Sequence, residues 1–147
     1  MLFRSVTIAA VARWLYNEPY VALPMSHELR RDEGGLRSVE YAWGRGDERA
    51  ALHVTVSGNA QPLVAGTEAE FITEHYWGYN SQRDGSTLEY RVEHPRWNVW
   101  DVTDASLMCD AAKLYGREFA ESLGAQPSSA FLAEGSAITV TRGVRLG

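Results

Sequence analysis

The sequence predicts an α+β fold dominated by a curved antiparallel β-sheet, a partly open barrel with about three short helices. Its 147 residues have the length of a single domain. Short segments in which apolar and polar residues alternate recur between glycine-containing turns. Apolar residues at helical spacing, or residues that can cap a helix, occur in only three segments, which predicts about three helices. Curling such a sheet limits its open edges, which favours a barrel-like form.

The first half of the chain combines one helix with a meander of strands. Ser5 is placed to cap a helix over residues 6–17, and Pro19 ends it. Turn residues then separate three alternating segments, which predicts consecutive hairpins. These predicted strands cover 20–29, 36–43 and 50–57.

The second half places two further helices among extended segments. Thr67 and Glu70 match a capping box, which predicts that a short helix follows directly. Asp110 caps a third helix over 111–123, which Gly116 weakens. The remaining predicted strands cover 76–81, 87–94, 97–108, 129–133 and 136–144.

Composition excludes several classes of protein. The net charge is −5 and the basic residues form no stripe, so we expect no nucleic-acid partner. Cys109 is the only cysteine, which excludes an internal disulfide and a cysteine-built metal cage. The N-terminus lacks the features of a signal peptide, and its apolar run is broken by Arg13 and too short to span a bilayer. We therefore expect a cytoplasmic protein with no membrane contact.

Known catalytic and cofactor motifs are mostly absent. The segment Gly44-Arg45-Gly46 lacks the later glycine of a dinucleotide-binding loop. No serine lies in a nucleophile-elbow pattern, and the four histidines have no metal-ligand spacing. The sequence therefore predicts no cofactor and no metal site.

One segment, 71–80, concentrates a carboxylate, an imidazole and several large aromatic side chains. Glu74 can serve there as an acid/base group or a hydrogen-bonding anchor, with Tyr76 and Tyr79 as pocket walls. The alternative is an aromatic cluster that fills the core, with Glu74 paired to an arginine. The sequence leaves both interpretations open.

A second segment, 90–97, contains a histidine on the apolar face of a predicted strand. Strict alternation points His94 to the same side as Tyr90, so it needs a hydrogen-bond partner and can act as a general base. The alternative is a core histidine whose hydrogen bonds are satisfied. Arg13 interrupts an apolar helix, and it either reaches a carboxylate such as Glu74 or extends to the surface.

A family resemblance rests mainly on three segments, together with Pro19-Tyr20 and Met25, which follow the first of them. The three segments are Ala12-Arg13-Trp14-Leu15-Tyr16, Phe71-Ile72-Thr73-Glu74-His75-Tyr76 and Val92-Glu93-His94-Pro95-Arg96-Trp97. In this order they resemble the YqjF-like family of bacterial proteins, placed within the acetoacetate decarboxylase-like superfamily. The resemblance implies one such domain over 1–147, with a barrel-like antiparallel sheet around an internal pocket. Members of that family begin further upstream, so we expect this chain to be N-terminally incomplete and a homo-oligomer to cover its exposed sheet edges.

The reaction that names this superfamily is decarboxylation through a lysine Schiff base. It requires a lysine whose pKa is lowered by burial or by a neighbouring cation. Lys113 is the only lysine, and it follows Asp110 in a predicted helix without a cationic neighbour. We therefore predict that the chain does not use this chemistry.

The leading hypothesis is a small-molecule-binding protein whose pocket holds an apolar or aromatic ligand, with or without a carboxylate. One alternative is a non-covalent acid/base enzyme of the lyase or isomerase type that uses His94 and Glu74. Another is a structural or regulatory protein without a ligand, so enzymatic activity stays an open question. The predicted pocket has walls and polar contacts from Tyr76, Tyr79, Tyr90, Trp97, Arg13, Glu74 and His94.

Overall fold

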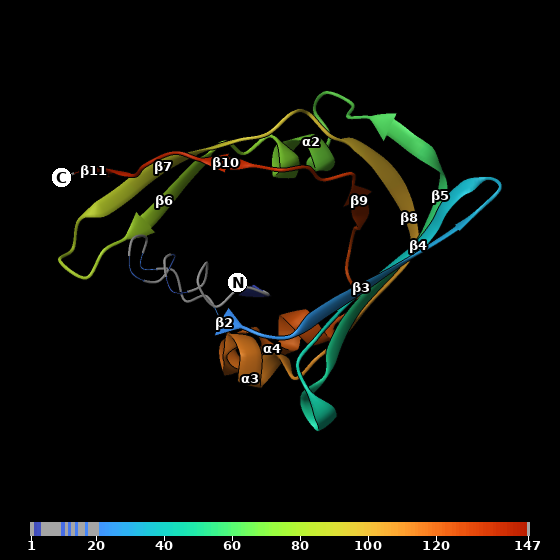
Figure 1. Cartoon of the computed structure of the whole chain (residues 1–147), viewed down its shortest axis with the longest axis horizontal. Coiled ribbons are helices and arrows are strands. Elements are labelled where there is room, and N and C mark those ends of the chain that lie inside the picture. The colour runs from blue at the N-terminus through green and yellow to red at the C-terminus, as the bar shows by residue number, and fades with distance from the viewer. Residues whose placement is uncertain are drawn as a thin grey trace. The chain divides into compact units, whose positions relative to one another are not determined.

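A computed structural model describes residues 2–3, 10, 12, 14, 17 and 21–146. The chain forms two compact units, each assembled from separate stretches of sequence. Unit 1 comprises 1–23, 62–98 and 134–147, and unit 2 comprises 24–61 and 99–133. Figure 1 labels the elements of both units.

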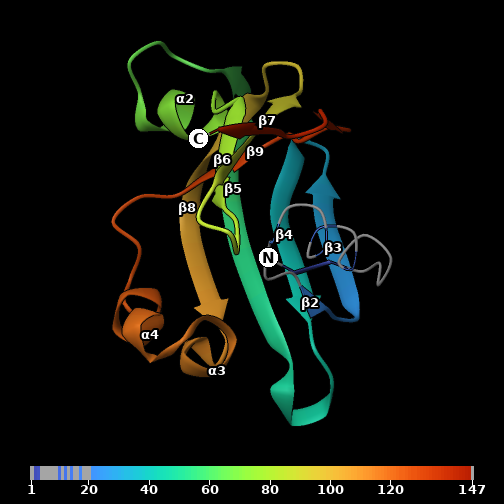
Figure 2. The ribbon, with the colours of Figure 1, turned by 90° about the vertical axis from the view of Figure 1, so that its left-hand side faces the viewer.

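Unit 2 is built on a five-stranded sheet in the order β3-β4-β5-β8-β9. The pairs β3–β4, β4–β5 and β8–β9 are antiparallel, and Figure 2 shows the long strands side by side. The first three strands follow one another in sequence, which confirms the predicted meander of hairpins. Their bounds are β3 (Met25–Asp32), β4 (Gly35–Trp43), β5 (Ala50–Pro62), β8 (Asn98–Met108) and β9 (Phe131–Ala133).

A small apolar core holds this sheet together. Leu36 and Val39 of β4 and Val56 of β5 are buried, and four partly buried apolar residues pack against them. Burying a side chain of this size stabilises the fold by about 1.5–3 kcal/mol. The partly buried residues are Val54, Trp100, Val102 and Leu132.

Two short helices follow β8 where the sequence predicts one. They are α3 (Ala111–Tyr115) and α4 (Arg117–Gly124), and Gly116 separates them with a φ of 105°. The prediction of a continuous helix over 111–123 is therefore wrong, because this backbone conformation interrupts the helix and suits glycine. The predicted cap is confirmed, since the Asp110 side chain accepts a hydrogen bond from the Lys113 N–H at 3.0 Å. A single 3₁₀ turn, η1 (Gly46–Glu48), lies between β4 and β5.

Strand β7 is central to the sheet of unit 1. It pairs antiparallel with β6 along one edge and with the short strands β10 and β11 along the other. The predicted continuous strand over 136–144 does not form. Strand β10 occupies two residues of that segment, and β11 begins only at its last residue. The bounds are β6 (Trp77–Ser81), β7 (Thr87–Glu93), β10 (Thr139–Val140) and β11 (Val144–Leu146).

The turn between β6 and β7 is held by a carboxylate. Asp84 accepts hydrogen bonds from the hydroxyl (2.7 Å) and the N–H (3.1 Å) of Ser86, and it pairs with Arg145 of β11. These contacts, those with Ser86 foremost, lower the pKa of Asp84 to about 2. The predicted hairpin at this turn is confirmed by the register that places Ser81 opposite Thr87.

Unit 1 also contains a short helix, α2 (Glu68–Thr73), and a parallel pair formed by β1 (Leu2–Phe3) and β2 (Val21–Ala22). The predicted helix over 6–17 lies almost wholly outside the described residues. The α+β class is confirmed, with three helices among the described residues. The sheets formed by these residues do not close into a barrel.

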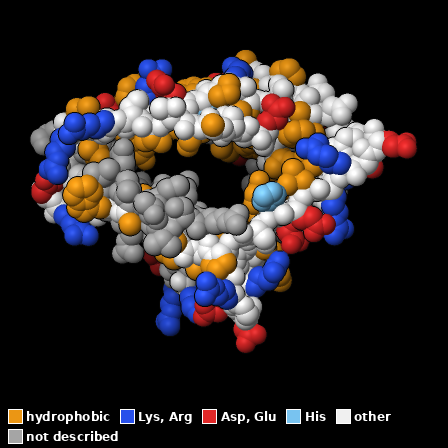
Figure 3. Space-filling model, in the orientation of Figure 1, with side chains coloured by type: hydrophobic (Ala, Val, Ile, Leu, Met, Phe, Trp, Pro, Cys, Tyr) orange, Lys and Arg blue, Asp and Glu red, His pale blue; other side chains and the backbone are white. Residues whose placement is uncertain are grey.

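Charged side chains of both signs are interspersed on the surface. On the face drawn in Figure 3, Lys and Arg alternate with Asp and Glu rather than gathering into a basic patch. In the part of the chain that the structure describes, no helix has the length and apolar character needed to cross a membrane.

Candidate functional site

The first turn of α2 positions a carboxylate. The Thr67 hydroxyl accepts the Glu70 N–H at 3.3 Å and donates to the Val64 carbonyl at 2.7 Å. The Glu70 side chain turns back and accepts the Gly66 N–H at 2.8 Å. The predicted cap at Thr67 is thus confirmed, although the Glu70 carboxylate binds the residue before the cap rather than the cap itself.

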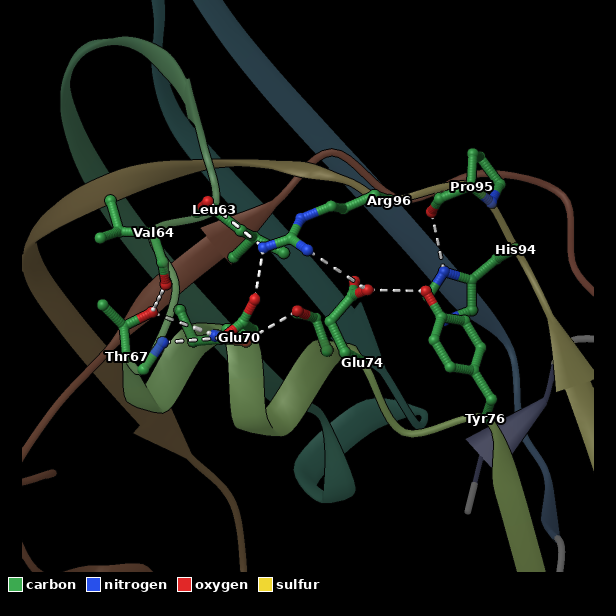
Figure 4. A network of polar contacts seen from close by, with 12 residues as sticks. Leu63, Val64, Thr67, Glu70, Glu74, Tyr76, His94, Pro95 and Arg96 are labelled. Atoms are coloured by element: carbon green, nitrogen blue, oxygen red, sulfur yellow. Dashed lines mark hydrogen bonds and ion pairs between the residues drawn. The ribbon is translucent and has the colours of Figure 1, made fainter.

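Arg96 connects this carboxylate to a second one on the same helix (Figure 4). Its guanidinium donates to Glu70 Oε1 at 2.5 Å and to the Leu63 carbonyl at 3.3 Å, and it lies 3.9 Å from Glu74 Oε2. The hydrogen bond from Gly66, followed by that from Arg96, lowers the pKa of Glu70. Glu70 therefore remains ionised at neutral pH.

Glu74 lies at the C-terminal end of α2 and is mostly buried. Its Oε2 accepts the Tyr76 hydroxyl at 2.8 Å. Its other oxygen, Oε1, is buried and has no hydrogen-bond partner among the described residues. The hydrogen bond to Glu74 raises the pKa of Tyr76, so this tyrosine keeps its proton and acts as a donor.

A stack of rings continues from Tyr76. The His94 ring lies 4.9 Å from the Tyr76 ring and 4.0 Å from the Trp97 ring, to which it is nearly parallel. His94 Nδ1 lies 2.9 Å from the Pro95 carbonyl oxygen. Because a carbonyl only accepts, Nδ1 must carry a proton, and in the neutral ring the lone pair lies on Nε2. The Trp97 indole N–H donates to the Ser136 hydroxyl at 3.0 Å.

These contacts define what we call the polar–aromatic cluster, which lies wholly within unit 1. Tyr76 forms its centre, with a carboxylate on one side and an imidazole on the other (Figure 4). An acid/base pair and a stacking surface therefore lie next to each other. The cluster comprises Glu70, Glu74, Tyr76, His94, Arg96 and Trp97.

The structure brings together four of the seven predicted site residues, namely Glu74, Tyr76, His94 and Trp97. Tyr79 is 61% exposed, and a hydrogen bond to Glu89 raises its pKa. It lies opposite Glu89 in the register of β6 and β7.

Tyr90 lies opposite Gly78, on the other face of the same two strands. Adjacent residues of a strand point to opposite faces, which separates Tyr79 from Tyr90. Arg13 lies outside the described residues.

Two residues of the cluster, Glu70 and Arg96, are not among the predicted site residues. The sequence identifies Glu70 only as part of the helix cap. However, Glu74 follows it by four residues, and this spacing places both carboxylates on one face of the helix. Two neighbouring carboxylates favour a cation beside them, and Arg96 lies only two residues after His94 in sequence. The spacing of Glu70 and Glu74 is therefore the sequence signal for an arginine partner such as Arg96.

An open depression of about 470 Å³ borders the cluster on the side of α2. Glu70 and Glu74 line it together with Phe71 and His75, whose rings meet edge to face at 4.8 Å. Within the described part of the chain, no group of His, Cys, Asp or Glu side chains is placed to hold a metal ion. The carboxylates, the Tyr76 hydroxyl and the His94 and Trp97 rings can take part in hydrogen bonding, proton transfer and ring stacking.

The fold and this cluster define an α+β protein with a polar–aromatic site on a small antiparallel sheet. The family model of DUF2071, described as an uncharacterized conserved protein, matches residues 1–137. The match covers most of the chain, so the chain belongs to the DUF2071 family. No curated protein and no solved structure gives a significant match.

Proposed function

We propose that the protein binds a small molecule at the polar–aromatic cluster. The observation that carries this proposal is the buried Oε1 of Glu74, which lacks a partner among the described residues. A buried acceptor without a hydrogen bond costs about 1–3 kcal/mol, and more when it is charged. A ligand N–H or O–H group would remove this cost, which would give the ligand affinity and orientation.

The charges of the cluster favour a particular class of ligand. Arg96 is already engaged by Glu70 and lies near Glu74, so a ligand carboxylate would meet two like charges. A neutral or cationic donor group is favoured instead. The stacked rings of His94 and Trp97 offer a surface for an aromatic or apolar body. The proposed ligand is therefore an aromatic alcohol, amide or amine rather than an acid.

A thermal-shift screen with matched aromatic amines, amides, alcohols and acids tests the proposal. A ligand present at about 100 times its Kd stabilises the folded state by about 2.7 kcal/mol. We expect hits among the donor compounds and not among the acids, and we expect Glu74→Gln to weaken them at least tenfold. Glu68→Gln is the matched control, because Glu68 lies on the same helix, is exposed and is outside the cluster. Equal loss in both variants, or a screen without any stabilising compound, refutes the proposal.

A second candidate function is non-covalent acid/base catalysis of the lyase or isomerase type. It is favoured by the Pro95 carbonyl beside His94 Nδ1, which leaves Nε2 as the base in the neutral ring. Glu74, held by the Tyr76 hydroxyl, would supply the second carboxyl group. A binding hit that is turned over, with a pH profile that changes in His94→Asn, supports the enzyme. Binding without turnover supports a binding protein only.

We further propose that lysine Schiff-base chemistry is not used. The Lys113 side chain is 59% exposed and pairs with Glu48, and this contact raises the pKa of the ammonium group. A lysine that stays protonated is not a nucleophile near neutral pH. Borohydride reduction in the presence of pyruvate or acetoacetate should leave the mass of the intact chain unchanged. A reduced adduct that is lost in Lys113→Ala would contradict this.

Placement of the chain in the YqjF-like family of the acetoacetate decarboxylase-like superfamily is also part of the proposal. Two of the three segments that carry this resemblance contain Glu74, Tyr76, His94 and Trp97, which meet in the cluster. We also propose a cytoplasmic location and a homo-oligomer that covers exposed sheet edges. Size-exclusion chromatography with light scattering tests the oligomer, because a monomer at micromolar concentration would refute it.

A further inference from the structure

Unit 2 contains a groove between the end of α4 and the sheet. Its floor is formed by side chains of β5 and β8, and its wall by the segment 122–127 that completes α4 and leads away from it. Phe131, at the start of β9, closes one side. The groove has a volume of about 440 Å³, which falls within the range of small-molecule pockets, roughly 300–1,000 Å³.

The lining of this groove is uncharged and mostly apolar. Leu52, Val54, Leu107, Leu123 and Phe131 supply the hydrophobic surface, and both Leu52 and Leu107 are exposed. None of the residues that line the groove, all of which are described, carries a charge. Such a surface attracts an apolar molecule and gives no pairing energy to an ionic one.

A smaller hollow of about 240 Å³ adjoins the groove. The two share the lining residues Ala105, Gln126, Pro127 and Ala130, so they are adjacent, and we refer to them together as the depression. The smaller hollow adds Asp104, the one charged residue in the lining of the combined depression. The depression is therefore apolar over most of its surface and acidic at one end.

We propose that this depression binds an elongated apolar molecule whose head group is a hydrogen-bond donor, uncharged or cationic, placed beside Asp104. The carboxylate would accept a hydrogen bond from a hydroxyl or ammonium head and repel a carboxylate or phosphate head. The site is separate from the one proposed above, because all of its residues belong to unit 2 and none belongs to the polar–aromatic cluster.

Titration with simple amphiphiles below their micelle concentration tests the proposal. The probes are 1-hexanol, 1-octanol, 1-decanol, decylamine and decanoate, and Kd is measured from amide chemical shifts of the labelled chain. Each buried methylene contributes about 0.8 kcal/mol, so the Kd should fall about fourfold per CH₂ along the alcohols. The shifted amides should lie in 122–131. Decanoate should bind at least tenfold more weakly than decylamine.

Two variants localise the site. Ala130→Trp places a large side chain in both parts of the depression without touching the buried core, and it should weaken 1-decanol at least tenfold. Ala112→Trp on exposed α3 lies outside the depression and should leave the Kd unchanged. Circular dichroism and the melting temperature of each variant establish that the fold is retained.

Asp104→Asn should remove the difference between decylamine and decanoate while keeping the chain-length dependence of the alcohols. Three results would overturn the proposal: no saturable binding of any probe, equal weakening by Ala130→Trp and Ala112→Trp, or decanoate binding as tightly as decylamine to the native chain. A failure here leaves the donor-compound screen at Glu74 unaffected, since that screen reports on unit 1.

Discussion

Gly78→Ala should destabilise unit 1 through a single steric conflict. Gly78 lies opposite Tyr90 in the pairing of β6 with β7. A methyl group added to Gly78 would lie 2.6 Å from the Tyr90 hydroxyl oxygen and closer still to two carbons of the ring. The glycine has no left-handed φ, so the expected effect comes from packing and not from the backbone.

The size of the effect follows from the rigidity of the ring. An aromatic ring cannot yield at its end as a long aliphatic chain can, so Tyr90 or the strand must move as a whole. Inserting a methylene or methyl group into such a contact typically costs about 1–3 kcal/mol. For a chain of this length, about 2 kcal/mol corresponds to a fall in melting temperature on the order of 5 °C.

Urea unfolding, followed by circular dichroism, measures this cost. Removing the ring with Tyr90→Leu should rescue Gly78→Ala, so the double variant should be more stable than the sum of the two single changes predicts. Gly124→Ala is the control, because a methyl group there meets no atom within 4 Å, and it should be neutral or stabilising by about 0.4–1 kcal/mol. A Gly78→Ala variant as stable as the native chain would refute this packing of Tyr90 against β6.

Two further predictions concern charged groups. Arg96→Leu should raise the pKa of Glu70, which can be measured by NMR of its carboxyl carbon. The pKa should stay below its ordinary value because the hydrogen bond from the Gly66 N–H remains. An unchanged pKa would show that Arg96 does not contact Glu70. Asp84, whose folded pKa of about 2 lies below its ordinary 3.8, should stabilise the fold above about pH 4 and lose that effect as the pH falls towards 2. Asp84→Asn should therefore lower the urea midpoint much more at pH 7 than at pH 2, and an equal deficit at both pH values would contradict this origin.

The order of the strands could be predicted from sequence wherever alternation and turn residues agreed, with strand ends that differ from the observed ones by up to five residues. The β3–β4–β5 meander is an example, because glycine-containing turns separate its alternating segments. Helix continuity could not be predicted as well. A glycine such as Gly116 destabilises a helix by about 1 kcal/mol relative to alanine. This cost weakens the helix but does not predict that it ends there. Only the observed φ of 105° shows that the helix stops there.

The candidate site could be predicted in part for a similar reason. Alternation relates residues within one strand, so it correctly separates the two faces of β7 but does not relate β7 to α2 or to the segment after Pro95. Glu74, Tyr76, His94 and Trp97 come from two separate stretches of the chain, 74–76 and 94–97, and only tertiary packing places these stretches together. The prediction of Tyr79 as a pocket wall rests on its closeness to Tyr76 in sequence, yet residues three positions apart in an extended chain point to opposite faces.

The charge balance of the cluster bears on which interpretation of Glu74 is preferable. Among the described residues, two carboxylates face one guanidinium, and the short contact of Arg96 is with Glu70, not with Glu74. In a purely structural network each buried carboxylate oxygen would have a partner, since an unpaired buried charge is costly. Here Glu70 receives the strong contacts, whereas Glu74 receives one hydroxyl and a distant guanidinium. An arrangement that leaves Glu74 Oε1 buried and unsatisfied is the one that a ligand with a hydrogen-bond donor would complete.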